Sequence, residues 1–130
     1  LRKLNKANEK RRILAYRYTQ ALKKIEAITC PVVRPDTVSA QHNYVIRCKE
    51  RDKLHLYLRE KNVSTGVHYM PIHLQPFYRK MFHGVKLPIV ETEWKKLLTL
   101  PLYPKLTFKE QDYIIYCIKN FYLAGNHKRS

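Results

Sequence analysis

Residues 39–69, SAQHNYVIRCKERDKLHLYLREKNVSTGVHY, decide the fold because the pattern of apolar residues changes within them. Residues 39–48 predict a strand, since Tyr44 and Ile46 would share one face of a sheet while their neighbours face the other way. Residues 50–61 place leucines one helical turn apart and therefore predict a helix.

The end of this helix and the next strand are also visible in the sequence. Asn62 stands where a helix commonly ends in a left-handed residue, and asparagine is the usual substitute for glycine there. Residues 64–69 predict a second short strand, in which Gly66 permits close approach of the backbone. The stretch thus predicts a strand, a helix and a strand in succession.

Before this stretch, residues 1–25 predict an amphipathic helix. Its apolar stripe consists of Leu4, Ala7, Leu14, Tyr18, Ala21 or Leu22, and Ile25. The stripe is already present at the first residues, and no residue that could cap the helix precedes it. We therefore expect residues 1–28 to be a linking helix that continues from a larger domain outside this sequence.

After the stretch, residues 90–98 predict a helix and residues 100–103 a third strand. Thr107 is followed three residues later by Glu110, which is the pattern of a capping box at the start of a last helix. We expect residues 124–130 to be a frayed tail. Residues 29–123 would then form a small α+β domain, in which helices cover one face of a sheet of about three strands.

Composition limits the classes of protein to which the chain can belong. No apolar run approaches the roughly 20 residues that a membrane-spanning helix needs. The three cysteines are odd in number and widely spaced, which favours a reducing cytoplasm over a disulfide framework. The formal net charge is +16, and nine of the 26 basic residues lie within residues 1–25. A basic nucleic-acid-binding module is therefore an alternative, although we do not expect it, because no RNA- or DNA-binding motif is present.

Residues 67–78, VHYMPIHLQPFY, have the composition of a ligand-facing segment. Prolines stiffen the backbone, and His68, Tyr69 and His73 can donate and accept protons. His68 and Tyr69 are equally well explained as core residues of a strand, whereas His73 lies on an irregular segment between prolines. The spacing of the two histidines and the absence of a nearby carboxylate do not favour a metal site.

Motifs that define common catalytic sites are absent from the sequence. There is no GxSxG nucleophile elbow, no GxxxxGK phosphate loop and no GxGxxG dinucleotide motif. The ten acidic residues lie mostly on predicted helix surfaces, so paired-carboxylate catalysis has no evident site. We expect no catalytic residue in this chain by itself.

Three segments, taken together, resemble the C-terminal part of the DegT/DnrJ/StrS family of sugar aminotransferases. They are LRKLNKANEKRRILAYRYTQAL, AQHNYVIRCKERDKLHLYLREKNVSTGVHYMPIHLQPFY and LPIVETEWKKLLTLPLYPKLTFKEQDYII. The similarity extends from Leu1 to about Tyr122. The runs TGVHYMPIHLQPFY and LPLYPKLT are its most specific parts, and Asn62 departs from the glycine that the family generally carries there.

The resemblance implies a fold and a function. The fold would be the small C-terminal domain of a fold-type-I aminotransferase, and the complete enzyme would be a dimer dependent on pyridoxal phosphate. That enzyme would transfer an amino group, typically from glutamate, to a nucleotide-linked keto sugar. His73, with Tyr69 and His68 beside it, would contact this substrate. The lysine that binds the cofactor would lie before Leu1, so we expect this chain alone to bind no cofactor and to be inactive. A stand-alone interaction domain derived from the small domain is a further alternative.

Overall fold

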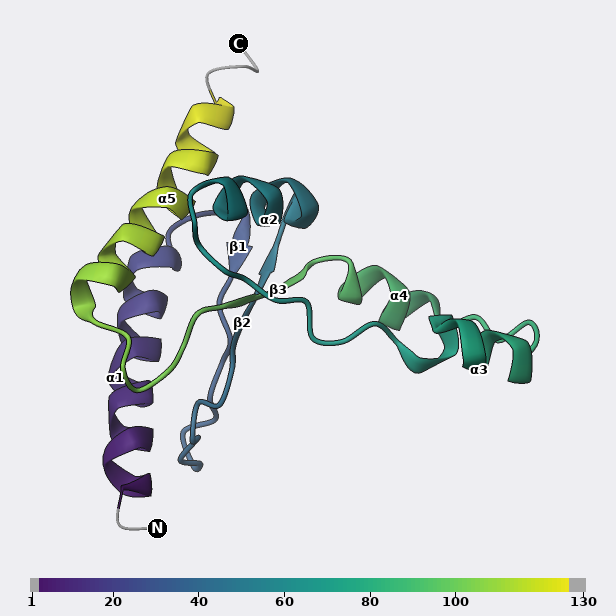
Figure 1. Cartoon of the computed structure of the whole chain (residues 1–130), viewed down its shortest axis with the longest axis horizontal. Coiled ribbons are helices and arrows are strands. Elements are labelled where there is room, and N and C mark those ends of the chain that lie inside the picture. Colours follow the sequence, from purple (N-terminus) through teal and green to yellow (C-terminus); the bar gives the residue numbers. More distant parts are fainter. Residues whose placement is uncertain (1–2, 127–130) are drawn as a thin grey trace.

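The computed structural model describes residues 3–126 of the chain, and Figure 1 shows their arrangement. The elements follow one another as α1 (Leu4–Leu22), β1 (Ile28–Thr29), β2 (Tyr44–Cys48), α2 (Arg51–Glu60), the 3-10 turn η1 (Ile72–Leu74), α3 (Pro76–Met81), α4 (Pro88–Trp94), β3 (Leu97–Leu100) and α5 (Phe108–Asn126).

The three strands form an antiparallel sheet in the order β1-β2-β3. Tyr44 pairs with Leu100 and Ile46 pairs with Leu98 across the two longer strands. All four of these side chains are buried, whereas Arg47 is exposed. The sheet therefore buries one face, as the alternation of side chains predicted, although β2 begins at Tyr44 and not at residue 39. The α+β fold class is confirmed.

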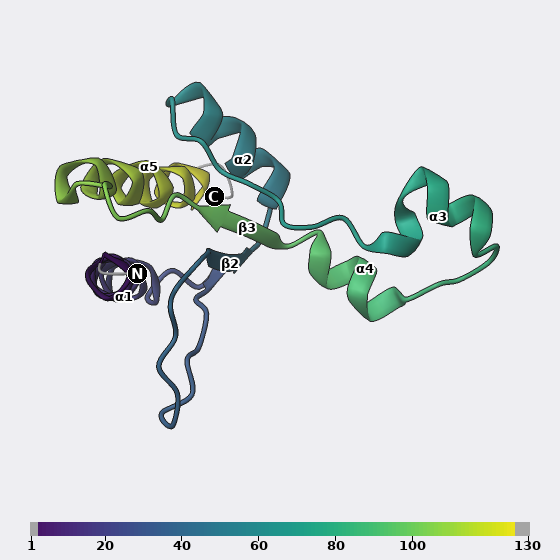
Figure 2. The ribbon, with the colours of Figure 1, turned by 60° about the horizontal axis from the view of Figure 1, so that its bottom comes forward.

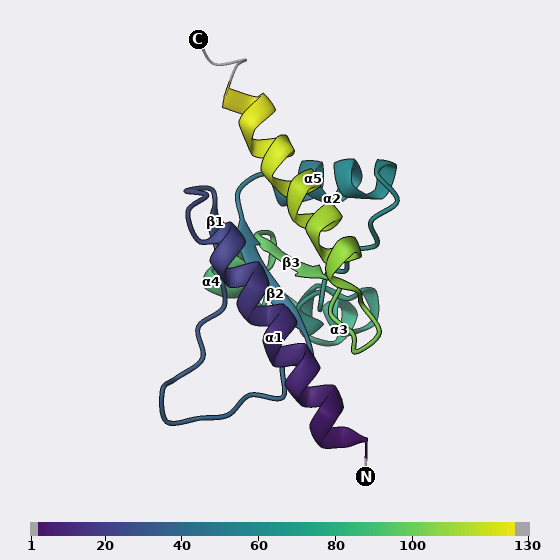
Figure 3. The ribbon, with the colours of Figure 1, turned by 90° about the vertical axis from the view of Figure 1, so that its left-hand side faces the viewer.

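Helices α1, α2 and α5 pack together with the sheet and enclose the hydrophobic core. Figure 3 shows α1 and α5 lying alongside each other. Leu54 and Leu58 of α2 are fully buried, as the helical spacing predicted. Other fully buried apolar side chains are Leu14, Tyr18, Leu22, Ile46, Leu98 and Ile118. We call this part, residues 4–66 and 96–123 without the loop 30–43, the body of the molecule.

A segment with little support from the body projects from one side of it. We define residues 69–94, which include η1, α3 and α4, as the arm, and Figures 1 and 2 show it extending away from the other helices. None of its three helical elements contains a buried apolar residue. Its large exposed apolar side chains are Tyr69, Met70, Ile72, Phe77, Met81, Phe82, Val85, Leu87, Ile89 and Val90.

Two of the predicted strands and one predicted helix were placed wrongly. Residues 64–69 form only a single antiparallel bridge, between Gly66 and Thr99, because the chain then leaves the sheet to enter the arm. The helix predicted over residues 90–98 ends at Trp94, and the strand predicted at 100–103 is β3 at Leu97–Leu100. The short apolar run at residues 97–100 suits a helix or a strand equally well, so periodicity alone could not show which of the two it forms. The two-residue strand β1 was not predicted.

The two ends of the chain agree only partly with the sequence predictions. Helix α1 covers Leu4–Leu22 of the predicted residues 1–25, and residues 1–2 lie outside the described part. Helix α5 continues to Asn126, beyond the point at which the frayed tail was predicted to begin. Residues 127–130 of that tail also lie outside the described part. Within residues 3–126, no helix has the length and apolar character needed to cross a membrane.

Candidate functional site

His68 lies at the point where the chain leaves the body to form the arm. The bridge between Gly66 and Thr99 has a hydrogen bond in each direction, of 3.0 Å from the Gly66 N–H and 2.7 Å from the Thr99 N–H. The His68 Nδ1 atom then lies 2.8 Å from the Thr99 hydroxyl oxygen. Thr99 is only 7% exposed, so this hydrogen bond attaches the imidazole to the edge of the sheet.

The imidazole also lies directly against Gly66. A Cβ atom added at Gly66 would be 2.4 Å from the His68 Cε1 atom and 3.1 Å from its Nδ1 atom. The first distance is far shorter than any van der Waals contact, so a side chain at this position would displace the ring. The close approach predicted at Gly66 is therefore present. The groups that approach it are the Thr99 backbone and the His68 side chain.

Gly66→Ala is expected to lower the free energy of unfolding by about 1–3 kcal/mol, the usual cost of overpacking. Urea denaturation of the 130-residue chain measures this change. If displacement of the imidazole is the cause, the same substitution made in a His68→Ala background should have little effect. An equal loss in both backgrounds would show that the ring is not the group that requires glycine.

Tyr69 is next to His68 but points its ring into a more open environment. The two ring centroids are 4.9 Å apart with an angle of 84° between the planes, and the peptide bond between the two residues is cis. Tyr69 is 76% exposed, which is high for a tyrosine that makes a ring contact. The pair therefore combines an imidazole held against the body with a phenol that is accessible to another molecule. The interpretation of Tyr69 as a core residue was wrong, because its side chain is exposed.

His73 has a different environment, inside the arm. Its Nε2 atom lies 3.0 Å from the Glu91 Oε1 atom, which also accepts a hydrogen bond of 3.0 Å from the Leu87 N–H. The Leu87 N–H and, to a lesser extent, the His73 imidazole hold the pKa of Glu91 below its usual value. The His73 side chain is only 8% exposed. His73 thus connects η1 to the start of α4, and the structure gives it a structural partner that the sequence did not suggest.

The structure brings only part of the predicted site together. His68 and Tyr69 are in contact, whereas within residues 3–126 no hydrogen bond or ring contact joins His73 to either of them. The partners Thr99 and Glu91 were missed. Neither carries a motif, and they lie 31 and 18 residues from the histidines that they contact.

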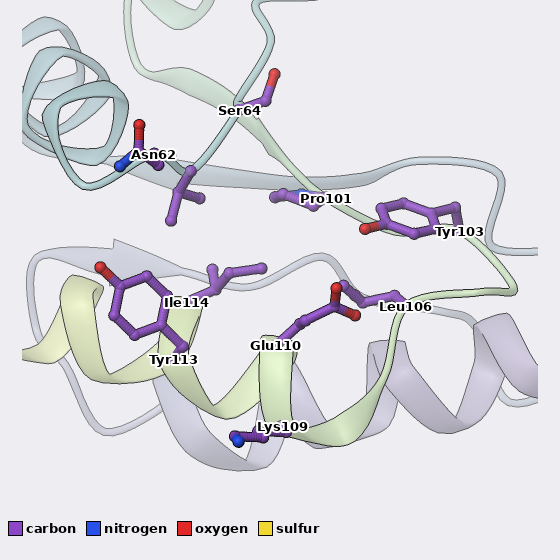
Figure 4. Close-up of a pocket in the computed structure, with 10 residues that line it drawn as sticks. Asn62, Ser64, Pro101, Tyr103, Leu106, Lys109, Glu110, Tyr113 and Ile114 are labelled. Atoms are coloured by element: carbon purple, nitrogen blue, oxygen red, sulfur yellow. The ribbon is translucent and has the colours of Figure 1, made fainter.

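A surface hollow lies elsewhere, between α5 and the segments that follow α2 and β3. It has a volume of about 660 Å³, and Figure 4 shows the side chains around it. Its lining consists of Asn62, Val63, Ser64, Pro101, Tyr103, Leu106, Lys109, Glu110, Tyr113 and Ile114. None of the three predicted site residues contributes to this hollow. Its apolar floor is part of the body, and its polar residues do not converge on one point.

Comparison with known proteins decides the family. The sequence profile of the DegT/DnrJ/EryC1/StrS aminotransferase family matches residues 1–119. The chain belongs to this family. It is 36% identical over 125 residues to a pleiotropic regulatory protein of Geobacillus stearothermophilus. It is also 36% identical over 121 residues to the erythromycin biosynthesis sensory transduction protein EryC1 of Saccharopolyspora erythraea. Each match covers 92% of this chain and 33% of the relative, so the chain spans about a third of the length of these proteins.

A solved structure of the family supports the same conclusion. The S. venezuelae protein DesV, in complex with a ketimine intermediate, superposes with a TM-score of 0.87 at 30% sequence identity. The superposition covers 94% of this chain and 33% of DesV. The body and the arm therefore correspond to about a third of the DesV chain.

The described residues do not by themselves fit pyridoxal phosphate, the cofactor of DegT/DnrJ/EryC1/StrS aminotransferases. The cofactor is held in such enzymes through a lysine amine shielded from water. No lysine in residues 3–126 is buried, and the hollow of 660 Å³ has one lysine, Lys109, at its margin. Within the same residues, no group of three or more His, Cys, Asp or Glu side chains converges to bind a metal ion. We therefore assign no step of cofactor chemistry to this chain.

Proposed function

We propose that this chain is the smaller lobe of a pyridoxal-phosphate-dependent sugar aminotransferase and is inactive without the larger lobe. The complete enzyme would transfer an amino group, from glutamate, to a nucleotide-linked keto sugar in deoxysugar or surface polysaccharide biosynthesis. The match of the aminotransferase family to residues 1–119, in a chain a third as long as its relatives, carries this proposal. The larger lobe would supply the cofactor and the lysine that holds it.

The exposed surface of the arm supports the proposal that this chain packs against a larger lobe. It exposes ten large apolar side chains and buries none in its helical elements, so it has no hydrophobic core of its own. Contiguous exposed apolar surface on this scale is typical of an interface with another protein surface. We infer that the arm docks on the larger lobe and forms one wall of the cleft for the sugar. His68 and Tyr69, at the base of the arm, would then contact the sugar, and His73 would hold the wall in shape while facing the same cleft.

The proposal also includes the organisation and location of the protein. Residues 1–28 would link the two lobes, residues 29–123 would form the small domain, and residues 124–130 a C-terminal tail. The complete enzyme would form a homodimer. A cytoplasmic location is supported by the cysteines, since Cys30, Cys48 and Cys117 are all free thiols. Burial raises the pKa of Cys48 to about 11, so this thiol is protonated and unreactive at neutral pH.

The proposal predicts that the 130-residue chain retains no pyridoxal phosphate. After incubation with the cofactor and dialysis, its visible spectrum should lack the band of lysine-bound cofactor, whereas the chain joined to the larger lobe should show that band. Borohydride reduction followed by peptide mapping provides a second measurement. Stoichiometric labelling of one lysine in the isolated chain would contradict the proposal, and sparse labelling spread over exposed lysines would agree with it.

A further inference from the structure

The direction of the hydrogen bond between the Thr99 hydroxyl and His68 decides which ring nitrogen carries the hydrogen in the neutral form of the imidazole. Thr99 is buried, and both of its backbone hydrogen-bonding groups are already used in the bridge to Gly66. Within residues 3–126, the hydroxyl oxygen of Thr99 makes a hydrogen bond of 2.8 Å with His68 Nδ1. A buried hydroxyl hydrogen without an acceptor is costly, so the hydroxyl donates to Nδ1.

This direction fixes the tautomer of the imidazole. A neutral imidazole whose Nδ1 atom accepts a hydrogen bond carries its hydrogen on Nε2. In residues 3–126, Nε2 has no hydrogen-bond partner, yet it is not one of the buried side-chain atoms that lack one. The Nε2 atom is therefore not completely buried and keeps some exposure to solvent. Gly66 lies against one side of the ring, since a Cβ added there would be 2.4 Å from Cε1, 3.1 Å from Nδ1 and 3.3 Å from Nε2, and it limits movement of the ring toward the sheet.

We propose that Thr99 is a positioning residue that holds His68 as a hydrogen-bond donor toward an oxygen atom of the sugar substrate. This inference rests on the proposed function, which places the sugar beside His68 and Tyr69. Nε2–H would donate to a hydroxyl or carbonyl oxygen of the sugar, while Thr99 itself touches only the imidazole. The donor is preorganised because both its tautomer and its ring position are set before the substrate arrives.

The first experiment is spectroscopic and uses the 130-residue chain. The ¹⁵N chemical shifts of the His68 ring at a pH where it is neutral report which nitrogen carries hydrogen and whether Nδ1 accepts a hydrogen bond. Wild type should show hydrogen on Nε2 and a hydrogen-bonded Nδ1. Thr99→Val keeps the branched shape but removes the hydroxyl, so the Nδ1 resonance should move. Thr99→Ser should restore it. Hydrogen on Nδ1 in the wild type would overturn the inference.

The second experiment measures kcat and KM of the complete aminotransferase, with the nucleotide sugar that it aminates varied. Thr99→Val should raise KM for the sugar about tenfold, the effect of one hydrogen bond, with a smaller change in kcat. Thr99→Ser should restore the wild-type KM. Where Thr99→Val does not fold, Thr99→Ala replaces it, because it also lacks the hydroxyl.

His68→Ala separates the failure of this inference from failure of the proposed function. If His68→Ala raises KM and Thr99→Val does not, the positioning role of Thr99 is wrong while the site at His68 stands. If His68→Ala leaves KM and kcat unchanged, the placement of the sugar beside His68 is wrong, and the donor role is overturned with it.

Discussion

Gln111→Ala is expected to lower the free energy of unfolding of the 130-residue chain by about 2–4 kcal/mol, because it creates a cavity and leaves buried polar groups without partners. The Gln111 side chain is fully buried between α5 and α1. Its amide nitrogen donates to the Leu14 carbonyl oxygen at 2.7 Å. Its amide oxygen accepts from the Arg17 Nε atom at 3.0 Å. One buried side chain of α5 thus binds two polar groups of α1.

Urea denaturation measures this loss, and Asp112→Ala is the matched control. Asp112 is the next residue on α5 and also contacts Arg17, at 2.6 Å, but its side chain is largely exposed. Exposed ion pairs contribute about 0.2–1 kcal/mol, so the control should be close to wild type. Gln111→Met, which fills the space without the hydrogen bonds, should fall between the two. Equal stabilities for Gln111→Ala and Asp112→Ala would show that the buried amide does not join the helices.

Local patterns in the sequence predicted those elements whose own residues determine them. The capping box is present, since the Thr107 N–H and hydroxyl bind Glu110 Oε2 at 2.8 and 2.7 Å and the Glu110 N–H donates to the Thr107 hydroxyl at 3.2 Å. These hydrogen bonds hold the pKa of Glu110 below its usual value. Asn62 has a φ of 58°, the left-handed conformation predicted at the end of α2. Both features depend on neighbours within a few residues, which is why periodicity and capping rules found them.

Elements that depend on distant partners were not predictable in this way. Strand β1 has two residues, and it exists because Ile28 and Thr29 pair with Cys48 and Arg47 of β2. The helix predicted to continue to residue 98 gives way to β3, because these residues pair with β2.

The candidate site also depends on partners that are distant in the sequence. The composition of residues 67–78 located the segment, but the partner of His68 comes from β3, and the partner of His73 comes from α4.

Phe77→Asp combined with Ile89→Asp is expected to reduce kcat/KM of the complete aminotransferase by about a thousandfold, because each charge in the interface would cost about 2 kcal/mol. Phe77 on α3 and Ile89 on α4 are both largely exposed in this chain. If the arm docks on the larger lobe, each aspartate would place an unpaired charge in a closed interface. The cleft wall would then fail to form, and His68 would not be presented to the sugar.

The same double substitution should leave the isolated chain nearly unchanged in stability, because both side chains are largely exposed in it. Tyr116→Asp is the control, since Tyr116 on α5 is about as exposed as these two residues but lies outside the arm. It should retain activity in the complete enzyme. Unfolding of the isolated chain by the arm substitutions would show that the arm stabilises the body, and unchanged kcat/KM would show that it does not dock. Loss of activity without loss of stability is the result that only an interface explains, because a solvent-exposed segment without a partner would tolerate both charges.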